Sequence, residues 1–251
     1  MKYILFVVEG PSDSAFYAPI IKKLIKDKYQ FKIVRTDMTS EISDKFQYKV
    51  GKDLVEYVIK NKTSRDYYDI NSISKIVMIM DIDGCYVHSR LIRASSKRGT
   101  RYYSDHIETY NPKNLQCRNT TKQRNIRELK DCKYLFGDKP FELYYNCVNL
   151  DHVISNERNM PNDEKESNAD KVGKYYAKNL PEYLELLMQI LPAGDLQNSW
   201  KYLKKSTNSL ERLSNFYYFI DDCVMASKDN NNNNKFKDKV LKMNNINIKE
   251  R

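Results

Sequence analysis

The chain has 251 residues, of which 43 are Lys or Arg and 33 are Asp or Glu, so its formal net charge is +10. This length fits one large domain, or a core with a smaller appendage. Hydrophobic residues make up 41% of the chain, which is enough apolar material for a core and excludes a globally disordered protein. No apolar run approaches the roughly 18 to 20 residues of a membrane span, so we expect neither a secretion signal nor membrane insertion.

The first 82 residues alternate between strand and helix patterns. Short apolar runs at 3–8, 31–34 and 75–82 predict buried strands. Residues 11–25 and 53–60 carry apolar side chains at three- and four-residue spacing, which predicts helices. This order predicts an α/β fold with a largely parallel sheet flanked by helices. A later strand is expected at 141–145, followed by a turn into another helix at 149–154.

A basic insert at about 90–133 interrupts this pattern, with Arg and Lys interleaved with Tyr. Such a surface can follow a phosphate backbone and stack on bases, and the positive net charge favours an anionic partner. A Lys- and Asn-rich composition can also reflect genomic base bias. The residues expected to contact nucleic acid are Arg90, Arg93, Lys97, Arg98, Arg101, Tyr102 and Tyr103.

The sequence predicts three regions along the chain. We expect a catalytic domain over 1–158, a helical C-terminal appendage over 159–226, and a flexible tail rich in Asn and Lys over 227–251. The cysteines are odd in number, widely spaced, and lack the spacing of zinc ligands, so they are interpreted as reduced thiols of a cytoplasmic protein. They are Cys85, Cys117, Cys132, Cys147 and Cys223.

Acidic residues follow two of the predicted strands. Glu9 ends the first strand, and Asp81 and Asp83 end the third, where alternate side chains of an extended segment point to the same side. Ligands of parallel α/β sheets collect at the carboxyl ends of the strands. Asp81 follows a strongly apolar run and would be costly to bury unless it is paired or bound to metal. Three converging carboxylates predict a Mg²⁺ site.

The segments Glu9-Gly10-Pro11-Ser12-Asp13 and Asp81-Ile82-Asp83-Gly84 resemble the motifs of the Toprim family. The resemblance implies that Glu9 acts as a general acid/base or metal ligand and that Asp81 and Asp83 hold Mg²⁺. The first segment is most similar to OLD-type nucleases of phage defence, in which the acidic residue at the position of Asp13 can also contact metal. The second segment lacks the Gly and Arg that commonly follow it, which disfavours a topoisomerase or a primase.

These features predict a Mg²⁺-dependent (or Mn²⁺-dependent) Toprim-like nuclease that hydrolyses phosphodiester bonds in RNA or DNA, in phage defence or RNA processing. Glu9 would position or deprotonate water, or protonate the leaving oxygen, while the metal stabilises the developing charge. Glu142 or Asp151 could supply a further ligand. No phosphate-binding loop of the G-x-x-x-x-G-K-[ST] type occurs, so any ATP hydrolysis would come from a separate ATPase partner.

Two other functions remain open from the sequence. Asp81-Ile82-Asp83-Gly84 also resembles the nucleophile motif of HAD-type phosphatases, with Asp81 as nucleophile, Asp83 as acid/base and Asp221-Asp222 imitating the distal acidic motif. The third alternative is a non-catalytic RNA- or DNA-binding module that uses the basic insert.

Overall fold

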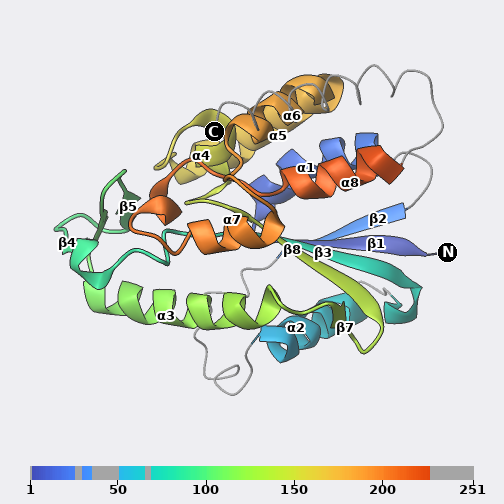
Figure 1. Cartoon of the computed structure of the whole chain (residues 1–251), viewed down its shortest axis with the longest axis horizontal. Coiled ribbons are helices and arrows are strands. Elements are labelled where there is room, and N and C mark those ends of the chain that lie inside the picture. The colour runs from blue at the N-terminus through green and yellow to red at the C-terminus, as the bar shows by residue number, and fades with distance from the viewer. Residues whose placement is uncertain (1, 26–29, 36–50, 66–68, 227–251) are drawn as a thin grey trace.

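The protein, seen here as a computed structural model, has one central sheet with helices on both faces (Figure 1). The structure describes residues 2–25, 30–35, 51–65 and 69–226. The predicted tail at 227–251 lies outside these residues. None of the described helices has the length and apolar character needed to cross a membrane.

The strands are β1 (Tyr3–Val8), β2 (Gln30–Arg35), β3 (Ile73–Asp81), β4 (Ile92–Ala94), β5 (Thr100–Tyr102), β6 (Ile107–Thr109), β7 (Tyr134–Leu135) and β8 (Lys139–Asn146). The α-helices are α1 (Pro11–Ile25), α2 (Gly51–Arg65), α3 (Pro112–Leu129), α4 (Leu150–Ser155), α5 (Asn162–Lys178), α6 (Leu180–Gln189), α7 (Leu196–Tyr202) and α8 (Tyr217–Ala226). Short 3₁₀ turns are η2 (Ile70–Ser72), η3 (Ser89–Leu91) and η4 (Asn208–Leu210).

The central sheet has the strand order β2-β1-β3-β8-β7. Its first four strands are parallel and β7 pairs with β8 in the antiparallel sense. The predicted α/β class, the mostly parallel sheet and its four main strands are therefore confirmed. The parallel order places the carboxyl ends of β1, β3 and β8 side by side at one end of the sheet.

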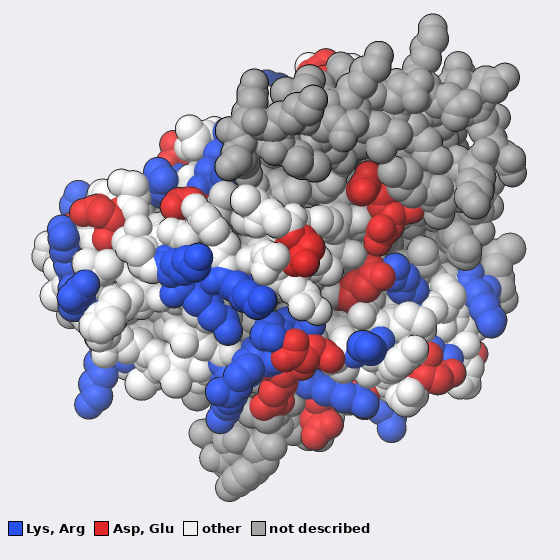
Figure 2. Space-filling view, viewed as in Figure 1, with Lys and Arg blue, Asp and Glu red and all other residues white. Residues whose placement is uncertain are grey.

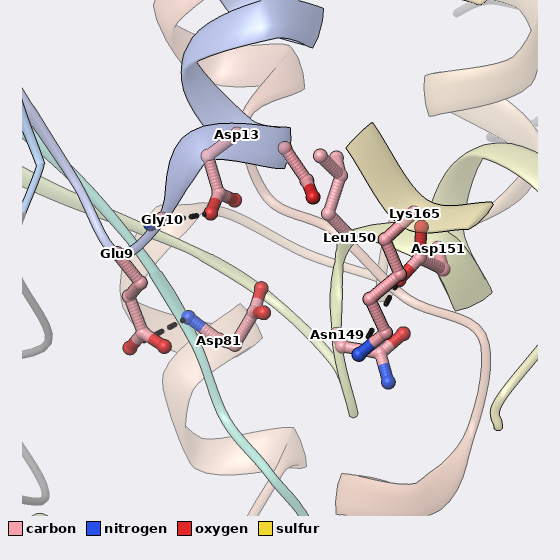
Figure 3. Close-up of a pocket in the computed structure, with 9 residues that line it drawn as sticks. Glu9, Gly10, Asp13, Asp81, Asn149, Leu150, Asp151 and Lys165 are labelled. Atoms are coloured by element: carbon pink, nitrogen blue, oxygen red, sulfur yellow. Dashed lines mark hydrogen bonds and ion pairs between the residues drawn. The ribbon is translucent and has the colours of Figure 1, made fainter. Parts of the chain in front are cut away.

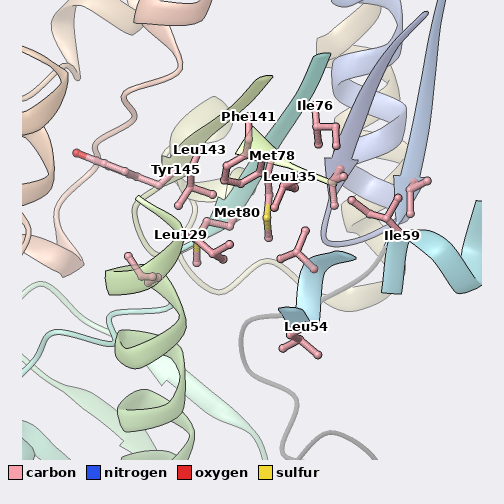
Figure 4. Packing of buried hydrophobic residues seen from close by; sticks show 14 of the residues in the cluster. Leu54, Ile59, Ile76, Met78, Met80, Leu129, Leu135, Phe141, Leu143 and Tyr145 are labelled. Atoms are coloured by element: carbon pink, nitrogen blue, oxygen red, sulfur yellow. The ribbon is translucent and has the colours of Figure 1, made fainter. Parts of the chain in front are cut away.

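Both faces of the sheet are buried, and the alternation of side chains along each strand decides what each face contacts. Leu5 and Val7 of β1 belong to a core cluster with α2 and α3, whereas Phe6 and Val8 belong to a cluster with α1, α5 and α6. Figure 4 shows the first cluster, in which Met78 and other sheet residues face the α2 and α3 side chains. We call the face of the sheet that packs against α2 and α3 the α3 side, and the face that packs against α1, α5 and α6 the α1 side.

The basic insert contains a helix that we did not predict. Its first part forms a small sheet of order β4-β6-β5, and its second part is the 18-residue helix α3. Asn111 caps this helix by accepting a hydrogen bond from the Asn114 backbone N–H. Apolar residues are sparse on α3, but Leu115, Ile126 and Leu129 are buried on one stripe. Ile126 and Leu129 pack α3 against the central sheet, whereas Leu115 packs against the small sheet of the insert.

The helices after residue 159 share a core with the first half of the chain. Tyr183 and Leu187 of α6 belong to the same buried cluster as Phe6 of β1 and Phe16 of α1. Figure 1 shows α5, α6 and α8 on the face of the sheet that α1 covers. The separate C-terminal appendage that we predicted is therefore not confirmed.

Helices α1 and α5 pack closely at Gly173, and this contact gives a prediction about stability. A Cβ atom added at Gly173 would lie 2.5 Å from the backbone oxygen of Phe16 and 2.8 Å from its Cα. Helix propensity alone would make Gly173→Ala stabilising by about 1 kcal/mol. Because backbone atoms must move to admit the methyl group, we expect Gly173→Ala to destabilise the protein by about 1 to 3 kcal/mol in urea unfolding. Ser167→Ala, at an exposed position of the same helix, is the control, and a stabilising Gly173→Ala would contradict this packing.

Candidate functional site

The carboxyl ends of three neighbouring strands meet at the site. Glu9 follows β1, Asp81 ends β3, and Asn146 ends β8. The Asp81 backbone N–H donates a hydrogen bond to Glu9 Oε1 over 3.2 Å, and Asn146 Nδ2 donates to Asp81 Oδ1 over 3.3 Å. Asn146 is itself held by Tyr17 of α1, whose hydroxyl donates to Asn146 Oδ1. The expected convergence of Glu9 and Asp81 therefore exists in the fold.

A pocket of about 250 Å³ opens beside these strand ends (Figure 3). Asp13 enters it from the first turn of α1, Asp151 from α4 and Lys165 from α5. The Asp13 carboxylate is oriented by the Gly10 backbone N–H, which donates to Oδ2 over 2.9 Å. The pocket is lined by Glu9, Gly10, Ser12, Asp13, Asp81, Asn149, Leu150, Asp151 and Lys165.

The carboxyl groups in this pocket are crowded and poorly solvated. Burial raises the pKa of Asp81 well above its usual range, and the negative charges of Asp13, Glu9 and Asp83 raise it further. Burial also raises the pKa of Asp13 to about 6, although the Gly10 hydrogen bond opposes this shift. Without a bound cation, ionising the carboxyl groups of Asp13 and Asp81 therefore costs electrostatic free energy.

Asp151 is the deepest acid of the pocket, with only 3% of its surface exposed. Burial raises the pKa of this carboxyl group too. Its Oδ2 lies 3.8 Å from Lys165 Nζ, while its Oδ1 is buried with no hydrogen-bond partner. Unpaired buried oxygen atoms are uncommon in folded proteins, and an ion or a water molecule is one of the partners that can satisfy them.

Asp83 lies apart from the pocket, against our expectation that Asp81 and Asp83 point to the same side. The extended backbone ends at Asp81, and Asp83 takes a left-handed conformation with φ of 51°. The alternation of a strand therefore stops before Asp83. Its carboxylate instead pairs with Lys122 and Arg118 of α3 and accepts a hydrogen bond from the Tyr102 hydroxyl. Burial alone would raise the pKa of Asp83, but the positive charges of Lys122 and Arg118 outweigh it and lower the pKa.

Lys122 is a residue of the site that the sequence analysis missed. Its side chain is fully buried, and Nζ donates to Asp83 Oδ2 over 2.5 Å and to Glu9 Oε1 over 3.3 Å. Lys122 belongs to the basic insert at about 90–133, whose charges were expected on the surface. The available signal was its spacing, because Lys122 lies on the buried stripe that also carries Leu115, Ile126 and Leu129.

The residues expected to contact nucleic acid differ in how far they are exposed. Arg90, Arg93, Lys97 and Arg98 are exposed, and Tyr103 is also exposed, with its ring stacked on His106 at a centroid distance of 4.4 Å. Arg101 is half-buried. Tyr102 is buried and hydrogen-bonded to Asp83, so its ring does not lie on the surface where we expected it. Figure 2 shows a second gathering of Lys and Arg over α7 and the end of α3.

The remaining predicted acids lie elsewhere. Glu142 forms an ion pair with Lys75 over 2.6 Å near the beginnings of β8 and β3, at the other end of these strands from Asp81. Asp221 and Asp222 lie on α8, where the charges of Glu142 and Lys75 act on the pKa of Asp222. The structure therefore does not bring the distal acidic motif of the phosphatase alternative to Asp81.

The donor set of the pocket suits a hard cation that keeps most of its waters. Within the described residues, no three or more Asp, Glu, His or Cys side chains are arranged so that they could hold a metal ion. Mg²⁺ needs only one or two protein carboxylates, together with waters and substrate phosphate oxygens. The crowded carboxylates and the unpaired Asp151 oxygen fit such an ion. Comparisons of this chain with protein-family models, curated proteins and solved structures found no match.

The opposite environments of Asp81 and Asp83 predict opposite effects of the same substitution. In EDTA at neutral pH, we expect Asp81→Asn to raise the free energy of unfolding by about 1 kcal/mol, because it removes a crowded charge. Asp83→Asn should lower it by about 3 kcal/mol, because Lys122 loses a buried partner. Urea unfolding of the two variants beside the wild type measures both.

The pH dependence of the Asp81→Asn effect follows from linkage. The folded protein favours protonated Asp81, so the wild type loses stability relative to the variant as the pH rises above about 4, the usual pKa. The advantage of Asn should therefore grow toward neutral pH and vanish in acid. An advantage that grows as the pH falls would contradict the crowding of this carboxyl group.

Proposed function

We propose that this protein is a Mg²⁺- or Mn²⁺-dependent nuclease, similar to Toprim nucleases, that hydrolyses phosphodiester bonds in RNA or DNA. The observation that carries the proposal is the crowding of Asp13, Asp81 and Asp151 in one pocket at the carboxyl ends of a parallel sheet. A divalent cation would relieve this repulsion and would bring phosphate oxygens to the same place.

Each residue of the pocket has a role within this proposal. Asp13 and Asp81 would hold the ion, and Asp151 would contact it through water. Glu9 accepts a hydrogen bond from the Asp81 backbone N–H, which fixes its carboxylate next to the pocket, where it would orient water or protonate the leaving oxygen. When bound, the ion would stabilise negative charge on the phosphate during cleavage. Asp83 keeps Lys122 in place beside Glu9.

The exposed basic residues of the insert would bind the substrate backbone. The insert is joined to the site through α3, which carries Lys122, and through Tyr102, which donates to Asp83. A strand bound along the insert would thus lie on the part of the fold that contacts the acidic residues. A role in phage defence or RNA processing, and a separate ATPase partner, stay predictions from the sequence.

Cleavage assays test the proposal. We expect the protein to cut at least one of tRNA, ribosomal RNA, single-stranded DNA or plasmid in Mg²⁺ or Mn²⁺, and not in EDTA. Asp81→Asn should reduce the rate by about 100-fold or more, since it removes a ligand of the ion that would stabilise negative charge in the transition state. Asp138→Asn is the matched control, because Asp138 is exposed at the turn before β8, at the other end of that strand from the pocket.

The other outcomes of this assay have distinct meanings. Cleavage that persists in EDTA, or in purified Asp81→Asn, contradicts the proposal. Hydrolysis of an aryl phosphate without cleavage of nucleic acid would favour the phosphatase alternative. Binding of nucleic acid that strengthens in Asp81→Asn, with no cleavage by the wild type, would favour a non-catalytic binding module.

Salt dependence tests the nucleic-acid surface. Replacing Arg90, Lys97 and Arg98 by Gln should reduce the slope of log affinity against log salt by about 2 to 3, because each phosphate contact contributes about 0.7 to 0.9. The matched control replaces Lys201, Lys204 and Lys205, which are also exposed but lie at the end of α7 and in the loop after it. If only the variant of Lys201, Lys204 and Lys205 changes the slope, the substrate binds over the end of α7 and not along the insert.

A further inference from the structure

The acidic residues at the end of the sheet divide into two groups, and the strand alternation explains the division. Val7 of β1 faces α3, and Glu9, two residues later, meets Lys122 on that side. Ile79 of β3 faces α1, and Asp81, two residues later, meets the charge of Asp13. Glu9 thus contacts Lys122 on the α3 side, and Asp81 lies on the α1 side. Figure 3 shows the Asp81 carboxylate on the side of Asp13 and the Glu9 carboxylate pointing away from it.

The two groups differ in charge. On the α3 side, the carboxylates of Glu9 and Asp83 face the two cations Lys122 and Arg118, so the formal charges balance. On the α1 side, Asp13, Asp81 and Asp151 share the pocket with Lys165, which is the one cation among the described residues that line it, so these four side chains carry a formal charge of −2 when all three acids are ionised. One divalent cation would balance this second group.

An independent observation, on Asp151, also distinguishes the α1 side. Asp151 is 3% exposed and lines the pocket, yet its Oδ1 has no hydrogen-bond partner. Asp13 and Asp151 line the same pocket, and the negative charge of Asp151 acts on Asp13. An unpaired buried carboxylate oxygen beside two further carboxylates is what a hard cation, or a water bound to it, would satisfy.

We propose that Lys122 serves as a fixed internal cation between Glu9 and Asp83, and that the pocket binds a single divalent ion on the α1 side, held directly by Asp13 and Asp81 and contacted by Asp151 through water. This inference rests on the proposed metal-dependent function. It departs from what the Toprim resemblance implies, because Asp83 becomes a positioning residue that holds Lys122 and not a ligand.

A second metal ion is not expected to replace Lys122 between Glu9 and Asp83. Its side chain is fully buried, and Nζ contacts both carboxylates of the α3 side at once. An ion bound to Glu9 and Asp83 would lie beside this ammonium group, and the two positive charges would repel each other in a poorly solvated place. Moving Lys122 away would leave a buried charge without partners.

Counting bound Mn²⁺ tests the inference without any assay of activity. Electron paramagnetic resonance of free Mn²⁺ during titration of the full chain, without nucleic acid, should give one ion per chain. Asp13→Asn and Asp151→Asn should each weaken binding at least tenfold, and Asp138→Asn should leave it unchanged. Glu9→Gln should retain the single ion, since Glu9 belongs to the α3 side.

Two Lys122 variants sharpen this test. Lys122→Met leaves Glu9 and Asp83 without Lys122, so it should bind two Mn²⁺, and Mn²⁺ should raise its melting temperature more than that of the wild type. The double variant Lys122→Met/Asp83→Asn loses one charge of each sign, so it should fold without metal and bind one ion. This second variant keeps the test decisive if Lys122→Met alone is unfolded in EDTA.

The outcomes separate this inference from the proposed function. Two ions bound to the wild type, with metal-dependent cleavage, would overturn the role of Lys122 and leave the nuclease proposal standing. One ion that is lost in Glu9→Gln but kept in Asp13→Asn would place the ion on the wrong side and also overturn it. No bound ion at saturating Mn²⁺ would overturn both.

Discussion

The contact of the buried Lys122 ammonium group with Glu9 and Asp83 joins three separate segments at the end of the sheet. Glu9 follows β1, Asp83 lies in the turn after β3, and Lys122 comes from the middle of α3. A fully buried lysine is stable only when its charge is paired, so these three segments depend on one another. Tyr102 and Arg118 add contacts to the same carboxylate, and they extend the network into the small sheet of the insert. The insert is therefore attached to the strand ends through charge as well as through packing.

A second constraint is the parallel order of β1, β3 and β8, which gathers acidic residues that are far apart in the chain. The burial of both faces of the sheet leaves little solvent to stabilise their charges. Lys122 resolves this problem on the α3 side. Asp81 takes part in no ion pair among the described residues, and burial, together with the negative charges of its neighbours, raises the pKa of this carboxyl group. The proposed metal ion is the counterpart of Lys122 on the α1 side.

Much of the fold follows directly from the sequence, because its strands are continuous apolar runs and its first helices have clear apolar stripes. The same logic placed Glu9 and Asp81 together. The position of Asp83 could not be predicted, since it depends on a left-handed turn that ends the alternation of β3. Helix α3 was missed because its buried stripe contains Asn119 and Lys122 in place of apolar residues. Lys165 had no local signal, because its role depends on how α5 packs against α1.

The central claim is that a divalent cation binds among the acidic residues at the carboxyl ends of the strands. A crystal structure determined after soaking in Mn²⁺, with data collected at a wavelength where manganese scatters anomalously, tests this claim most directly. The account predicts one anomalous peak on the α1 side, within coordination distance of Asp13 or Asp81, with Lys122 still between Glu9 and Asp83. A protein that shows no peak in this pocket at saturating Mn²⁺ would contradict the account.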